Sequence, residues 1–144
     1  MTPITVRLDD GYKTTMSIRD HAVIADEPVD AGGEDAGPTP LEIFVGTLGA
    51  CIAVTTKAYA KRKNWPLEGV NVEVSMERLK AEHYPAYQGD APLIHVFKEH
   101  VEFEGPLSAE QLVRLHEIAK KCPVRVALET PAIFVDEPVV TPSN

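Results

Sequence analysis

TPLEIFVGTLGACIAVTTKAYAKRK, residues 39–63, is the stretch of sequence that decides the fold. Its opening is that of a capped helix, because Thr39 suits the N-cap, Pro40 the first helical position, and Glu42 can complete a capping box. The far end carries four basic residues, which favour the negative pole of a helix dipole: Lys57, Lys61, Arg62 and Lys63. The stretch therefore predicts one long helix that ends at the Asn-Trp-Pro sequence of residues 64–66.

The apolar residues of this helix cover nearly its whole circumference. They are Ile43, Phe44, Val45, Leu48, Ala50, Cys51, Ile52, Ala53, Val54 and Ala58. A helix without a solvated face is expected to be buried on all sides. It is expected to be too short to span a bilayer, since Lys57 follows after about a dozen and a half residues that include Gly and Thr. We therefore predict a central helix wrapped by other elements.

Length and charge narrow the class of protein. The 144 residues predict one domain, 1–144, that is large enough for a hydrophobic core. The net charge of −8 disfavours nucleic acid and anionic membranes as partners, because both select for clustered Lys and Arg. The first residues lack the features of a secretory signal, so we expect a cytoplasmic location. In a reducing cytoplasm two distant cysteines indicate inert core residues or a redox pair rather than a structural disulfide.

The residues before the helix predict a small antiparallel sheet. Residues 4–8 alternate and lead through Asp-Asp-Gly to residues 12–18, which is typical of a hairpin, and residues 21–25 predict a third strand. The following segment 26–38, DEPVDAGGEDAGP, holds three glycines but also five acidic residues, and no P-loop lysine follows it. We therefore interpret it as a structured loop that delivers the chain to the helix, not as a phosphate cradle.

A second hairpin is predicted after the helix. Residues 70–76 alternate as in a half-buried strand, and residues 93–103 are the expected partner. The connection at 82–92 is long for a hairpin and could overhang a pocket. Ser108 with Gln111 then predicts the capping box of a helix with one apolar stripe.

The C-terminal part predicts a short helix and a short strand. The Cys-Pro pair at 122–123 ends the preceding helix and begins another that runs through Leu128. Residues 132–135 predict a last strand, and residues 137–144 a loose tail. Strands, a central helix, a hairpin and further helices in this order predict an α+β fold.

No residue pattern predicts a metal or a nucleotide site. The histidines lack the helical spacing of metal ligands, neither cysteine belongs to a C-x-x-C pair, and no Walker or GxSxG motif occurs. We therefore expect no metal and no bound cofactor.

The two cysteines remain as candidates for chemistry. Cys51 is either a small core hydrophobe or a nucleophile. Cys122 lies at the predicted N-cap of a helix, a position that favours a thiolate and makes it the more acidic thiol. If Cys51 reacts, it needs a cation from outside its own helix, because Lys57 points elsewhere. Arg19, at the corner between two predicted strands, is the available cation.

Two runs of the sequence carry a resemblance to a known family. They are GPTPLEIFVGTLGACIAVTTKAYAKRKNWPLEGVNVEV, residues 37–74, and GPLSAEQLVRLHEIAKKCPVRVAL, residues 105–128. The capped helix opening, the Gly-Ala-Cys at mid-helix, the Trp-Pro-Leu and the later Cys-Pro resemble the OsmC/Ohr family of thiol-dependent hydroperoxide reductases. The resemblance covers residues 19–135 and is stronger to the broad OsmC-like branch than to the dedicated organic hydroperoxide reductases.

The resemblance implies roles for three residues. Cys51 matches the peroxidatic thiol, Cys122 the thiol that resolves it as a disulfide, and Arg19 the arginine that holds the first cysteine as a thiolate. The family implies antiparallel sheets that enclose the central helix, in an intertwined homodimer with two sites at its interface. It further implies organic peroxides, and also hydrogen peroxide, as substrates and an external dithiol, small or protein-bound, as reductant.

Glu42 departs from the family pattern. The family commonly places a glutamate directly after the helix-opening proline, and here Leu41 holds that position. At 100° and 1.5 Å per residue, Glu42 and Cys51 lie on opposite faces and about 13 Å apart along the helix. Glu42 is therefore either a helix cap alone or a residue that acts across a dimer interface.

Two other functions stay open at this point. The same fold could serve a non-catalytic stress or binding protein whose thiols are unused. An acyl hydrolase that uses Cys51 is disfavoured, because no histidine base is placed for it.

Overall fold

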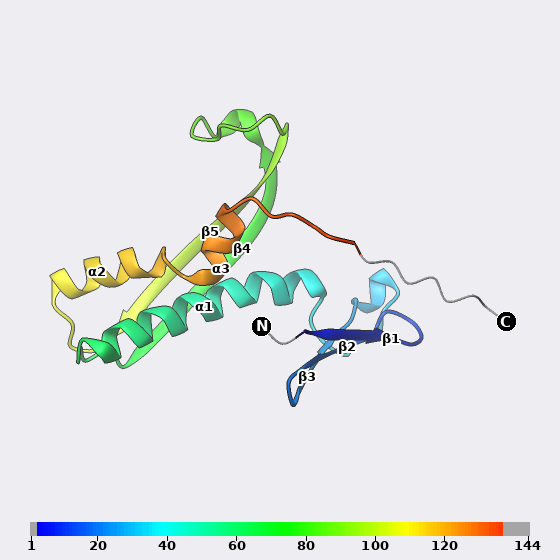
Figure 1. Ribbon diagram of the computed structural model, residues 1–144, viewed down its shortest axis with the longest axis horizontal. Coiled ribbons are helices and arrows are strands. Elements are labelled where there is room, and N and C mark those ends of the chain that lie inside the picture. The colour runs from blue at the N-terminus through cyan, green and yellow to red at the C-terminus, as the bar shows by residue number, and fades with distance from the viewer. Residues whose placement is uncertain (1–2, 137–144) are drawn as a thin grey trace.

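The computed structural model describes residues 3–136, which fold as predicted into an α+β architecture with antiparallel sheets (Figure 1). In chain order the elements are β1 (Thr5–Leu8), β2 (Thr14–Ile18), β3 (His21–Ala25), the 3₁₀ turn η1 (Val29–Ala31), α1 (Pro40–Arg62), β4 (Gly69–Lys80), the 3₁₀ turn η2 (Ala81–His83), β5 (Leu93–Glu104), α2 (Ala109–Ala119) and α3 (Pro123–Glu129). The strands form two separate sheets, β1-β2-β3 and β4-β5.

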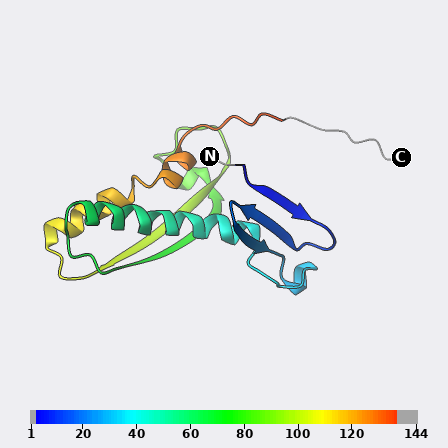
Figure 2. The ribbon, with the colours of Figure 1, turned by 60° about the horizontal axis from the view of Figure 1, so that its bottom comes forward.

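The hairpin of β4 and β5 is the floor on which α1 lies (Figures 1 and 2). The two strands pair antiparallel from Gly69 opposite Glu104 to Lys80 opposite Leu93, so both extend beyond their predicted ends. The sequence underestimates the length of β4, because the alternation of buried and exposed side chains stops at Arg78, which is exposed. The hydrogen-bonded pairing nevertheless continues. The ion pair of Lys98 with Glu77 supports this outer part of the hairpin at 2.9 Å.

The core forms where α1 meets β4 and the two later helices. One buried cluster joins α1 to the end of α2 and the start of α3, and it consists of Leu48, Ile52, Ala119 and Cys122. A second, at the other end of α1, consists of Ala60, Leu67 and Leu115. Gly49 allows the close approach of α1 to the sheet, because a Cβ there would meet Val74 Cγ2 at 3.3 Å. The core therefore depends on α1 and its contacts on one side.

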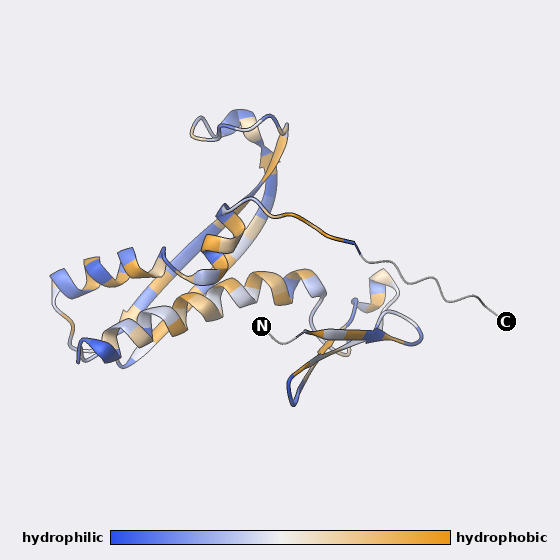
Figure 3. Cartoon of the chain, in the orientation of Figure 1, coloured by the Kyte–Doolittle hydropathy of each residue, from blue (hydrophilic) through white to orange (hydrophobic). Residues whose placement is uncertain are grey.

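Burial of α1 on all sides, which the sequence predicts, is wrong for the single chain. Its apolar residues Leu41, Phe44 and Val54 are exposed. The reason is the position of the β1-β2-β3 sheet, which lies beyond the N-terminal end of α1 and leaves its outer side uncovered (Figures 1 and 2). Figure 3 shows the apolar residues that continue along this helix.

The expectation that this helix is too short to span a bilayer is wrong by length and composition. Among the described residues, α1 alone is long and apolar enough to cross a membrane by length and composition. Its 23 residues nevertheless contribute to both buried clusters, and it packs against β4, α2 and α3. These contacts are those of a core helix.

The loop between β3 and α1 is structured, as predicted, around the buried carboxylate of Asp26. This carboxylate accepts hydrogen bonds from the backbone N–H groups of Glu27, Glu34 and Ala36 at 2.8, 3.1 and 3.1 Å. The bond from Ala36 is the largest cause that lowers the pKa of Asp26, and burial opposes it. Three N–H groups of the loop thus donate to the protein's own carboxylate, and the loop carries the chain to the start of α1.

The predictions for three segments after the helix have different outcomes. The predicted strand at 132–135 is wrong, because residues 131–136 have no regular structure and Ile133, Phe134 and Val135 are exposed. A strand needs a neighbouring edge, and the described part of the chain places none beside this segment. The connection 82–92 lies at the far tip of the hairpin, away from α1 (Figure 1). The tail predicted at 137–144 lies outside the described residues.

We predict that Asp26→Asn lowers the melting temperature at pH 7, because the amide cannot accept all three N–H bonds as a carboxylate does. The pKa of Asp26 is lowered in the folded state, so its stabilisation is present above the unfolded pKa and is lost as the pH falls through the folded value. The difference from wild type in thermal unfolding should therefore shrink at acid pH. Asp30→Asn in the same loop is the control, and a pH-independent difference for Asp26→Asn would contradict the prediction.

Candidate active site

Cys51 lies in the middle of α1 and is half-buried. It packs against the buried cluster of Leu48 and Ile52, on the side of the helix that faces the core. Its Sγ lies 4.0 Å from the Oγ1 of Thr55, one turn further along the helix. Cys51 is therefore a free thiol at the edge of the hydrophobic core and does not lie on the exposed side of α1.

Cys122 is the N-cap residue of α3, with Pro123 at the first helical position, as the sequence predicts. Its side chain is fully buried, and its Sγ accepts a hydrogen bond from the backbone N–H of Arg125 at 3.3 Å. The thiol therefore replaces the serine or threonine oxygen that usually caps a helix.

The structure brings the two cysteines together. Cys51 packs against the cluster that contains Cys122. Besides burial, a hydrogen bond between the two side chains contributes to the raised pKa of Cys122. The structure has no disulfide between them. The family resemblance implies that the two cysteines meet, whereas the residue patterns alone name both cysteines without placing them side by side, because their meeting depends on how α3 docks on α1.

Burial dominates the electrostatics of Cys122. It raises the pKa of the thiol, the backbone N–H of Arg125 lowers it, and the neighbouring Cys51 side chain raises it further. The prediction that the N-cap position makes Cys122 an acidic thiol is therefore wrong. The backbone N–H groups of Arg125 and Val124, at the start of a seven-residue helix, lower the pKa but do not offset the loss of water around a buried sulfur.

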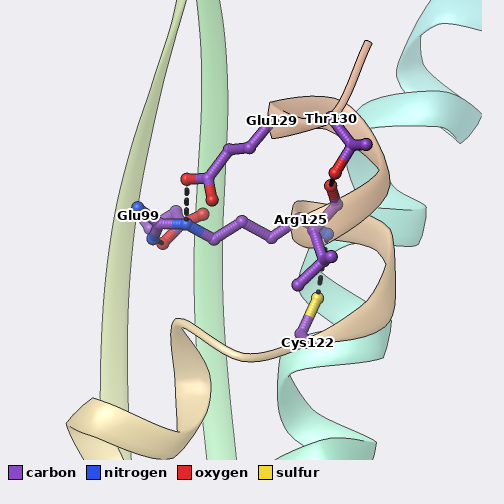
Figure 4. A network of polar contacts seen from close by, with 6 residues as sticks. Glu99, Cys122, Arg125, Glu129 and Thr130 are labelled. Carbon is purple, nitrogen blue, oxygen red and sulfur yellow. Dashed lines mark hydrogen bonds and ion pairs between the residues drawn. The ribbon is translucent and has the colours of Figure 1, made fainter. Parts of the chain in front are cut away.

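An ion-pair network that the sequence does not predict lies beside Cys122. The Nη1 of Arg125 donates to Glu99 Oε2 on β5 and its Nε to Glu129 Oε1, both at 2.9 Å (Figure 4). The network borders a cavity of about 420 Å³. The cavity is lined by Leu48, His95, Phe97, Glu99, Arg125, Leu128 and Glu129. The three-residue spacing from Cys122 to Arg125 is visible in the sequence, but nothing in the sequence pairs Arg125 with a strand residue.

Arg19 lies in the turn between β2 and β3, as predicted, and its backbone has a left-handed φ of 56°. Its side chain is exposed and forms no hydrogen bond or ion pair with residues 3–136. The sheet that carries it lies beyond the N-terminal end of α1 (Figure 1). The single chain thus does not bring Arg19 to Cys51, and its role stays a prediction.

Glu42 completes the predicted capping box of α1. Its Oε2 accepts the backbone N–H of Thr39 at 2.7 Å, and its own N–H donates to Thr39 Oγ1 at 3.2 Å. Lys57 points away from Cys51, as predicted, because its Nζ donates to the backbone carbonyls of Leu67 and Glu68. Capping is therefore confirmed for Glu42, and a catalytic role stays a prediction.

Within residues 3–136 no three His, Cys, Asp or Glu side chains gather as they would around a metal ion. The candidate site consists instead of two neighbouring free thiols in an α+β fold. One thiol is half-buried in a core helix, and the other is buried at a helix cap. The family model for OsmC-like proteins matches residues 32–137, which is most of the chain. The protein therefore belongs to this family. A comparison with curated proteins gave no match.

Solved structures of this family share the fold. An OsmC-like protein from Mycoplasma pneumoniae is 22% identical, with a TM-score of 0.68 over 88% of this chain and 86% of that one. An organic hydroperoxide resistance protein OsmC from Legionella pneumophila is 17% identical, with a TM-score of 0.61 over 89% and 90%. The organic hydroperoxide resistance protein OhrB of Bacillus subtilis is 20% identical, with a TM-score of 0.58 over 87% of each chain. At such identities the likeness shows the fold.

We predict that Glu42→Gln leaves the melting temperature nearly unchanged, because glutamine still accepts the Thr39 N–H in the capping box. Glu42→Ala removes that bond and should cost about 1 kcal/mol of stability. In both variants the alkylation rate of Cys51 should stay within about tenfold of wild type, since capping effects are local to the first turn. A severe loss of Cys51 reactivity in Glu42→Gln with unchanged melting would instead place the carboxylate in the site.

Proposed function

We propose that the protein is a thiol-dependent reductase of organic hydroperoxides and also of hydrogen peroxide. The single observation that carries this proposal is the packing of the free Cys51 against the free, buried Cys122. Membership of a family in which some proteins of the same fold are named for organic hydroperoxide resistance supports it.

Cys51 is the thiol that meets the peroxide in this proposal. It is the more exposed of the two, and a hydroperoxide needs room to reach the sulfur. The Cys51 thiolate attacks the distal oxygen, the O–O bond breaks, and the leaving alkoxide takes a proton to become the alcohol. The sulfur gains the hydroxyl group and becomes a sulfenic acid, so two electrons pass from sulfur to peroxide.

Cys122 resolves the sulfenic acid. Its sulfur attacks the Cys51 sulfur, an S–S bond forms, and the S–OH bond breaks to release hydroxide, which leaves as water with the Cys122 proton. An external dithiol then exchanges with the disulfide, becomes oxidised itself and returns both thiols. The raised pKa of Cys122 keeps it as an unreactive thiol until the sulfenic acid forms beside it.

A homodimer completes the proposed site. The uncovered side of α1 and the segment of residues 131–136 expose apolar side chains, including Val54, Ile133 and Phe134, of the kind that a second copy buries. The sheet that carries Arg19 lies beyond the N-terminal end of α1, so in this proposal Arg19 acts on Cys51 of the other copy, where its charge favours the thiolate. Glu42 is proposed as a cap whose carboxylate can also face the partner. A reducing cytoplasm suits the two free thiols.

A non-catalytic stress or binding protein of the same fold is the second candidate function. It is favoured by one observation, the absence of a cation from β1-β2-β3 beside Cys51 within residues 3–136. Without such a cation the thiol has no local partner for its charged form. The two candidates differ in what one equivalent of hydroperoxide does to the reduced protein.

We predict that one equivalent of an organic hydroperoxide removes both titratable thiols of the reduced protein without cross-linking two chains. Cys51→Ser should abolish peroxide consumption, because it removes the attacking sulfur. Cys122→Ser should allow one turnover and leave a sulfenic acid that dimedone traps. Thiol titration and intact-mass spectrometry measure these outcomes. Retention of both thiols would favour the non-catalytic candidate, and reversed behaviour of the two variants would exchange their roles.

We predict that Arg19→Ala slows alkylation of Cys51 at neutral pH by about tenfold or more and moves the midpoint of its pH profile upward, as expected when a charge near a reacting sulfur is removed. The fold should be unaffected, since the Arg19 side chain is exposed. Arg7→Ala is the matched control, because Arg7 lies on the same sheet and, among residues 3–136, pairs only with Asp9. An unchanged alkylation profile in Arg19→Ala would remove this residue from the site.

A further inference from the structure

The helix that carries Cys122 at its start has little to hold it in place. α3 has only seven residues, and none of them is fully buried. A helix of that length is not stable by itself, so its position depends on tertiary contacts. It packs against α1, and its Val124 reaches the cluster around Leu48 and Cys122. The distance between the two sulfurs therefore depends on whatever else fixes α3.

Arg125 fixes α3 to the sheet. Its guanidinium bridges from α3 to Glu99 on β5 at 2.9 Å and bonds Glu129 on its own helix at 2.9 Å (Figure 4). The two carboxylates differ in shielding, because the Glu99 side chain is 18% exposed and that of Glu129 is 61% exposed. Ion pairs shielded from water are screened less, so the bridge to Glu99 is the stronger constraint.

The same residue also holds the sulfur. The backbone N–H of Arg125 donates to Cys122 Sγ, while its side chain is held by Glu99. Because Arg125 has both its Nε and Nη1 engaged by carboxylates, its charge is compensated, and the side chain is not among the groups that shift the pKa of Cys122. The side chain can thus act on Cys122 through geometry and not through charge.

We propose that Arg125, through its bridge to Glu99, is a positioning residue that holds the Cys122 sulfur within disulfide reach of Cys51. The inference rests on the proposed function for its role in turnover. Its equilibrium consequence, a high effective molarity of Cys122 beside Cys51, does not require peroxide. Loss of the bridge frees α3 and lowers that effective molarity, because an orientation that was fixed must then be found by motion.

The test is the equilibrium of the reduced protein with glutathione and its disulfide. One glutathione disulfide accepts two electrons, the S–S bond between Cys51 and Cys122 forms, and two glutathione thiols are released. In Arg125→Ala we expect a disulfide that is about tenfold less favoured, which corresponds to a potential about 30 mV more positive. The lifetime of the Cys51 sulfenic acid after peroxide should lengthen by about tenfold, as dimedone trapping over time measures.

Variants of the two carboxylates distinguish positioning from general loss of stability. Glu99→Gln should shift the potential about as far as Arg125→Ala does, whereas Glu129→Gln, which removes a charge from the same guanidinium, should shift the equilibrium less than about twofold. Arg114→Ala is the control on the neighbouring helix, because the Arg114 side chain bonds Glu117 and Tyr59 and neither cysteine, and it should leave the potential unchanged. Arg125→Lys keeps one charged bond and should fall between wild type and Arg125→Ala.

The outcomes separate cleanly. The proposal is overturned if the equilibrium constant for disulfide formation stays within about twofold of wild type in both Arg125→Ala and Glu99→Gln. A shift in Arg114→Ala as large as that in Arg125→Ala also overturns it, since the effect would then be general. If Arg125→Ala does not fold, Glu99→Gln and Arg125→Lys carry the test. Failure of the proposed function is a different result, namely no sulfenic acid in any variant, and it leaves the glutathione equilibrium measurable.

Discussion

The burial of one sulfur atom holds the site together. Cys122 lies in the same cluster as Leu48 and Ile52 of α1 and Ala119 of α2, so three helices meet at its side chain. A fully buried thiol gains packing and loses solvation, which explains both why the start of α3 docks against α1 and why the pKa of the thiol is raised. The docking of Cys122 and its raised pKa therefore have one physical cause.

The elements that the sequence predicts correctly are those with local signals. The ends of α1 are encoded in the capping box of Thr39 and Glu42 and in the breaker sequence after Lys63, and the structure places both where expected. The N-cap position of Cys122 follows from Pro123 in the same way. Both signals act within one helical turn, so they hold whatever the rest of the chain does.

The elements that the sequence misses depend on partners distant in the chain. The alternation of residues 132–135 is typical of a strand, but no strand edge of the described chain lies beside it. The apolar circumference of α1 predicts complete burial, yet one side stays uncovered in a single chain. The pair of Arg125 with Glu99 is likewise tertiary, and the sequence carries no local pattern for it. The meeting of the two cysteines is tertiary as well, and it is expected only through the family resemblance.

A resolving thiol with a raised pKa is consistent with the chemistry proposed for it. A thiolate exposed to bulk solvent would itself be open to oxidation, and only the thiolate is a strong nucleophile. Burial suppresses that reactivity until a sulfenic sulfur is formed at contact distance, where high effective molarity offsets the small thiolate fraction. The offset works only while Cys122 is held in place, and α3 is too short to hold itself. In the proposed mechanism the demand for a fixed sulfur therefore falls on the bridge from Arg125 to Glu99, so an ion pair that itself takes no part in the chemistry becomes part of the condition under which the buried thiol can react.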